Sequence, residues 1–112
     1  MKLAQVRRYA MSLPDVTEEP HFKYTSFRVR RKIFVTAPPD GEFIHVFVTE
    51  EQRQLALALE PDVVEKLRWG TSVVGLRVRL ASAKPAFVSE LVRQSWACKA
   101  PKSARAPNRS QR

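Results

Sequence analysis

Two stretches of the chain alternate cationic with aliphatic side chains, in FRVRRKIFV (residues 27–35) and VGLRVRL (residues 74–80). The alternating cations are Arg28, Arg30 and Lys32 in the first stretch and Arg77 and Arg79 in the second. Because a β-strand sends successive side chains to opposite faces, each stretch predicts one aliphatic and one cationic face. If both strands share a sheet, the five cations form one basic surface. Such a surface is suited to a polyanion, so we predict that these five cations contact phosphate groups.

A second interpretation of the same cations stays open. Surface arginines also keep a sheet soluble and pair with nearby carboxylates, such as Glu42, Glu50 or Glu51. Arg77 and Arg79 are the better candidates for phosphate contacts, because no acid lies within several residues of either. The charge on the sheet face separates the two interpretations: continuous basic coverage favours a polyanion, and neutralisation by acids of residues 15–19 favours a solvated face.

The net charge is unevenly distributed along the 112 residues. The chain carries a formal charge of +9, of which +5 belongs to residues 99–112, where no acid occurs, so residues 1–98 carry +4. The last segment, KAPKSARAPNRSQR, is poor in apolar residues and rich in proline and charge. We therefore expect one domain over residues 1–98 and a basic, disordered tail over residues 99–112.

No set of residues predicts catalysis, a metal site or a cofactor. His21 and His45 lack ligand-like spacing, and three glycines are too few for a phosphate-binding loop. We read His45 as structural and Trp69, beside Gly70, as a turn or core anchor, with a pocket wall as the alternative. The prediction is a non-enzymatic protein without metal or cofactor.

The sequence also bears on the compartment. The one cysteine, Cys98, fits a reducing environment, and no secretory signal or membrane-spanning apolar run is visible. We therefore expect a soluble cytoplasmic protein without membrane contact.

The apolar spacing predicts helices and strands in a mixed order. In the first part of the chain we expect a helix over residues 1–13, an acidic connector over 15–20, and strands over 21–25, 27–37 and 43–48 with a turn at 38–41. In the second part we expect a helix capped by Thr49 and Gln52, a short helix begun by Pro61, a strand over 73–80, and a last helix that begins at Ser82 or Lys84. An α+β two-layer sandwich satisfies this order. Its antiparallel sheet has helices on one face, because the other face is basic.

Several of these segments together resemble the MmcQ/YjbR family over roughly residues 2–97. The matching segments are SLPDV at 12–16 with Glu18 and Glu19, FRV at 27–29 leading into KIF at 32–34, Trp69, the strand ending at Leu80, and the last helix with Leu91, Ser95 and Trp96. Lys32 is the clearest position to carry over. This chain has Arg31 where the family usually has glycine before that lysine, and Trp96 where a tyrosine is more usual.

The resemblance implies a fold and two functions. The fold is a two-layer α/β sandwich similar to secretion chaperones. Family members are commonly described as DNA-binding, which agrees with the cationic strands. The similarity to secretion chaperones implies an alternative, a protein- or peptide-binding module that uses its sheet or an apolar helix groove.

Overall fold

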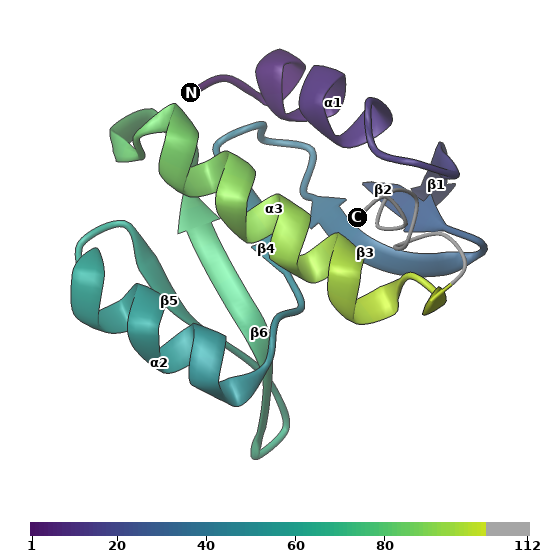
Figure 1. Ribbon diagram of the computed structural model, residues 1–112. Helices are drawn as coiled ribbons and strands as arrows, with labels where there is room; N and C mark the ends of the chain where they lie inside the picture. The colour runs from purple at the N-terminus through teal and green to yellow at the C-terminus, as the bar shows by residue number, and fades with distance from the viewer. Residues whose placement is uncertain (103–112) are drawn as a thin grey trace, which may run out of the picture.

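The strands form a sheet, and helix α3 crosses one of its faces (Figure 1). The structure is a computed structural model that describes residues 1–102. Within them, six antiparallel strands are ordered β1-β2-β3-β4-β6-β5. The elements are α1 (Leu3–Met11), β1 (Val16–His21), β2 (Tyr24–Val29), β3 (Lys32–Ala37), β4 (Phe43–Val46), α2 (Glu50–Leu59), β5 (Val64–Trp69), β6 (Ser72–Arg79), a short 3₁₀ turn (Leu80–Ser82) and α3 (Pro85–Lys99). The expected α+β class is confirmed.

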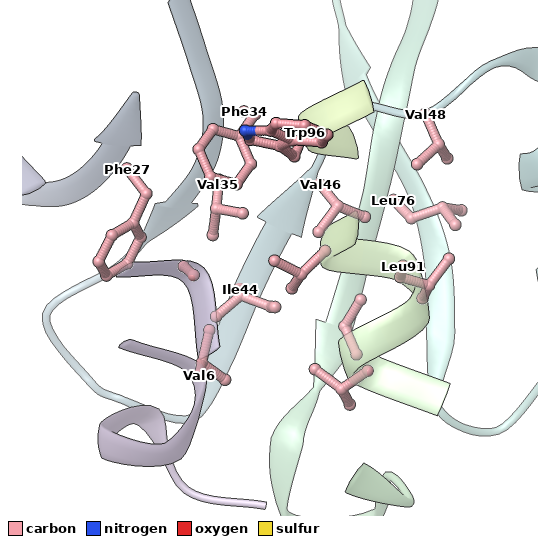
Figure 2. Packing of buried hydrophobic residues seen from close by; sticks show 14 of the residues in the cluster. Val6, Phe27, Phe34, Val35, Ile44, Val46, Val48, Leu76, Leu91 and Trp96 are labelled. Carbon is pink, nitrogen blue, oxygen red and sulfur yellow. The ribbon is translucent and has the colours of Figure 1, made fainter. Parts of the chain in front are cut away.

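The hydrophobic core lies between the sheet and the helices. Val6 of α1, Ile44 of β4 and Leu91 of α3 belong to one buried cluster (Figure 2). On β6, Leu76 and Val78 are fully buried while Arg77, between them, is not, which is the predicted period of two. The cationic and aliphatic faces of this strand are therefore as expected.

Helix ends follow their sequence signals. Thr49 and Gln52 form the predicted capping box, in which each side chain bonds the backbone of the other residue. Pro85 begins α3, where a missing N–H is harmless. Helix α3 continues through Lys99, and Ala100 is buried, so the first residues of the expected tail belong to the fold. The rest of that tail, residues 103–112, lies outside the described residues.

Four expected elements are wrong. The strand expected over residues 21–25 is instead the end of β1, a turn at Phe22 and Lys23, and the start of β2. Residues 16–21 form strand β1 at the edge of the sheet rather than a connector, and Pro20 is tolerated because an edge strand needs fewer ladder bonds. The segment after Pro61 forms strand β5 rather than a helix, since Val64 pairs with Val78. The expected strand over residues 27–37 is a hairpin, β2–β3.

Arg30 and Arg31 make the turn of the β2–β3 hairpin. Both have positive φ, 49° and 76°, as a two-residue type I′ turn requires. Asparagine and glycine usually occupy such positions, so the two arginines gave no sequence signal for a turn. The glycine that the family resemblance implies at position 31 would adopt this backbone conformation without steric cost.

The sheet is split between β3 and β4. These strands pair only through Val35–Val46 and Thr36–His45, so the next pair in register would be Phe34 with Phe47. A bulge in β3 places Phe34 out of the regular alternation, and Phe34 and Val35 are both fully buried. The Ser95 hydroxyl of α3 occupies the gap: it donates to the Phe34 carbonyl at 2.6 Å and accepts from the Phe47 N–H at 2.7 Å. One side chain thus replaces a ladder hydrogen bond.

We predict that Ser95→Ala lowers the free energy of unfolding by about 1–3 kcal/mol, because the Phe34 carbonyl and the Phe47 N–H lose their shared partner. Chemical denaturation measures the change. The matched control is Ser12→Ala, whose exposed hydroxyl bonds only the Tyr9 carbonyl and should matter little. Equal stability of the Ser95 and Ser12 variants would contradict the bridge.

Replacing Arg31 with glycine should raise the free energy of unfolding by up to about 1 kcal/mol, because glycine adopts positive φ without steric cost. The control Lys32→Gly removes the same charge at a strand position and should destabilise instead. Thermal or chemical denaturation compares both with the wild type. A loss of stability in Arg31→Gly would show that the turn is not strained at this residue.

Candidate functional site

A row of aligned residues crosses the open face of the sheet. Each strand contributes one member, in the order Glu19, Ser26, Thr36, His45, Arg77 and Glu65. Their strand neighbours Val35, Val46 and Leu76 pack in the core, so the row faces away from the helices. Carboxylates therefore stand at both ends of the row, with an imidazole and a guanidinium between them.

The first group of predicted cations does not share a strand face. Arg28 lies on the open face, but Arg30 is in the turn, and Lys32 pairs with the buried Val29 and so belongs to the opposite face. The interpretation of a single cationic strand face in this segment is wrong, because the chain reverses at Arg30 and Arg31.

Two of these arginines contact acidic residues, one in strand β1 and one directly before it. Arg28 donates to the Ser26 hydroxyl at 3.0 Å and lies 3.9 Å from a Glu19 carboxylate oxygen. Arg30 donates to Asp15 at 3.0 Å. Neutralisation by residues 15–19 is therefore what the structure shows at this end of the sheet.

Arg77 and Arg79 share one aromatic ring at the other end. The guanidinium carbon atoms of Arg77 and Arg79 lie 3.8 Å and 5.1 Å from the centroid of Phe43, which pairs with Arg79 across β4 and β6. Arg77 is 3.5 Å from the exposed Glu65, and its Nε is buried without a hydrogen-bond partner among residues 1–102. Arg79 is exposed and forms no ion pair within the described part of the chain. We call these three residues the Phe43 cation cluster.

A groove of about 480 Å³ opens on the same face, between the ends of the β1–β2 and β5–β6 hairpins. Its lining residues are His21, Tyr24, Ile33, Thr36, His45, Phe47, Leu67, Trp69, Val74 and Lys99. Among residues 1–102, no aspartate or glutamate lines it. The groove is therefore aromatic and apolar, with an ammonium group as its charged component.

Four aromatic rings of the groove form two neighbouring pairs. The Phe47 and Trp69 ring centroids are 6.4 Å apart, and those of Tyr24 and His45 are 6.0 Å apart. Phe47 lies over Gly75, where an added Cβ would stand 3.2 Å from its ring and 2.2 Å from the Val46 carbonyl oxygen. Only glycine fits there.

Sequence reasoning missed most of this groove. Its walls come from strands far apart in the chain, and only the pocket-wall alternative for Trp69 pointed to it. Trp69 is 67% exposed, so its interpretation as a core anchor is wrong. The exposed tryptophan beside a turn glycine was the available signal.

His45 stands at the boundary between the groove and the Phe43 cation cluster. Its Nδ1 lies 3.2 Å from the Thr36 hydroxyl. Burial lowers the pKa of His45, and the positive charge of Arg77 lowers it further, against a smaller opposing effect of Asp40. The ring is therefore neutral at neutral pH, with one nitrogen a donor and the other an acceptor.

Residues 1–102 contain no group of three or more histidine, cysteine, aspartate or glutamate side chains placed to hold a metal ion. In the same part of the chain, none of the helices has the length and apolar content that crossing a membrane requires.

The fold and the open-face groove define a class of small two-layer α+β proteins with a helix-covered antiparallel sheet. The chain belongs to the YjbR family, whose model matches residues 11–98. The fold is similar to the crystal structure of the Deinococcus radiodurans protein DR2400, a DUF419 domain, with a TM-score of 0.74 at 14% identity. The alignment covers 94% of this chain and 86% of that one. The comparison with curated proteins gave no match.

Folding stability should depend on pH through His45. Because its pKa is lowered in the folded protein, the unfolded chain binds the proton first as pH falls through about 6.5, and stability decreases. Above that pH the histidine is neutral in both states and contributes no dependence. His45→Gln should remove this component, as measured by denaturation at about pH 7.5 and about pH 5.5.

An NMR titration of the His45 ring provides the direct check on its pKa. Arg77→Gln should raise the pKa, because one of the two lowering causes is removed. A ring that titrates at or above about 6.5 in the wild type would contradict the assigned environment.

Proposed function

We propose that the protein is a non-catalytic, cytoplasmic nucleic-acid-binding protein that contacts DNA phosphates through the open face of its sheet. The observation that carries this proposal is the Phe43 cation cluster beside an aromatic groove that no carboxylate of residues 1–102 lines. Phosphate contacts supply affinity, and aromatic rings supply stacking surfaces, which together are the usual components of such interfaces.

The five predicted cations are expected to differ in importance. Arg79 is exposed, and Arg77 has only an exposed carboxylate partner, which contributes little in water and exchanges readily for a phosphate. Lys32 is exposed at the start of β3. Arg28 donates to the Ser26 hydroxyl and the Pro20 carbonyl, and Arg30 donates to Asp15, whereas no hydrogen bond joins Arg77 to Glu65 within residues 1–102. We therefore expect Arg28 and Arg30 to contribute least to phosphate binding.

The alternative, a protein- or peptide-binding module, has one supporting observation. Leu55 and Leu59 lie one turn apart on α2 and are 59% and 62% exposed. Pairing of a partner's strand with an edge of the sheet is less favoured. Edge strand β1 carries Pro20, and edge strand β5 carries the charged residues Glu65, Lys66 and Arg68, and both features discourage pairing with a further strand. We therefore place nucleic acid first.

The test compares two double substitutions that remove the same charge. Arg77→Ala with Arg79→Ala should weaken binding to duplex DNA of any sequence and reduce the salt slope by about 2, because each arginine that no longer neutralises a phosphate lowers the slope by about 1. Arg28→Ala with Arg30→Ala, the matched control, should change the slope much less. Fluorescence anisotropy over a range of salt concentrations measures both.

A chain that ends after Lys102 separates the sheet face from residues 103–112. It retains every described helix and strand, so salt-dependent binding should persist. If it does not bind, or if both double variants lose the same amount, net charge alone explains the binding and the sheet face is a solvated surface. Nuclease-insensitive capture of one defined protein that competes with DNA would favour the alternative.

A further inference from the structure

We propose that the groove between the β1–β2 and β5–β6 hairpin ends binds an unpaired nucleobase together with its phosphate. The preferred nucleic acid is then single-stranded rather than an intact duplex. This inference rests on the proposed function and names its ligand. The shared chemistry is a planar base that carries an anionic group, whether from a strand or from a free nucleotide.

The walls of the groove offer stacking surfaces. Tyr24, Phe47 and Trp69 come from three different segments and line one space, and the Trp69 indole leaves most of its surface open. Every base has a π-face, so aromatic walls hold bases with little sequence preference. The volume of about 480 Å³ lies within the range of small-ligand pockets, roughly 300–1,000 Å³.

The polar part of the groove suits the edge of a base. The Thr36 hydroxyl and the His45 imidazole line it together, and the His45 Nε2 makes no hydrogen bond within residues 1–102. A neutral imidazole bonded at Nδ1 leaves this second nitrogen for a ligand. Base edges carry donors and acceptors, which an unpaired base leaves accessible.

The charge around the groove suits a phosphate. Lys99 lines the groove, with its ammonium 6.0 Å from the centroid of the Phe47 ring. Arg77 is the cross-strand partner of His45, which lines the groove. Its guanidinium lies over the Phe43 ring, which Arg79 also contacts. A strand whose base occupies the groove thus finds cations on both sides, whereas a basic peptide is repelled.

A paired base cannot use this site without leaving the duplex. Bases in a duplex are stacked inside the helix, and a protein that contacts their faces must receive them unpaired or flipped out. The groove is a hollow that opens between two hairpin ends, so it accepts a base that projects from its strand.

The experiment uses the full chain and three probes: a dT12 oligonucleotide, the dT12·dA12 duplex and dTMP. We expect dT12 to bind more tightly than the duplex. Trp69→Ala should weaken dT12 binding at least about fivefold, because a stacking surface is removed, and change duplex binding less than about twofold. Phe22→Ala is the matched control, because Phe22 is an aromatic residue of the other hairpin end, 93% exposed and absent from the groove lining.

The dTMP arm identifies the source of the base. Competition by dTMP only at much higher concentration supports a strand as the ligand, and competition at equal concentration supports a free nucleotide in the same groove. Equal binding of dT12 to the wild type and to Trp69→Ala overturns the groove assignment. The proposed function fails separately, if the Arg77 and Arg79 double variant binds every probe like the wild type.

Discussion

The arrangement of the sheet depends on one hydroxyl group, that of Ser95. Strands β3 and β4 share only two residue pairs, and the Ser95 side chain bridges the backbone groups at the place where the third pair would form. Because the bridge lets the strands separate without orphaning buried polar groups, Phe47 leaves the ladder and becomes a wall of the groove. Trp96, the next residue, fixes the same helix to the segment between α1 and β1 by donating to the Pro14 carbonyl. The hollow on the open face is therefore a consequence of how α3 is attached to the covered face.

Strand register decides which cations meet carboxylates and which do not. Strand β1 aligns Glu19 with Ser26, which lies beside Arg28. The residue directly before β1, Asp15, accepts a hydrogen bond from Arg30 in the β2–β3 turn. At the other end of the sheet, β6 lies between β4 and β5, so Arg77 meets His45 on one side and Glu65 on the other. Arg79 is instead paired with Phe43, an apolar residue. The electrostatic character of the face thus changes along the sheet, although the sequence alternates in the same way in both stretches.

Signals that lie within a few residues of one another were sufficient for several parts of this fold. The capping box at Thr49 and Gln52 and the alternation of β6 were predicted correctly, because each depends on local geometry. The turn at Arg30 and Arg31 was missed because its side chains are not those that favour positive φ. Strand β1 was missed because charges and a proline mask an edge strand, whose side chains need not be buried. The groove could not be predicted, since its residues meet only after the strand order and the split between β3 and β4 are set.

Gly75 carries an evolutionary consequence of this arrangement. It binds nothing, yet any larger residue there would collide with the Val46 carbonyl and displace the Phe47 ring. Variation at the aromatic positions changes the lining of the groove, whereas variation at position 75 disturbs the backbone beneath it. A substitution at position 75 would have to move the β4 backbone away from β6, so the constraint belongs to the sheet as well as to the groove, and a lineage that gave up the groove would still keep this glycine.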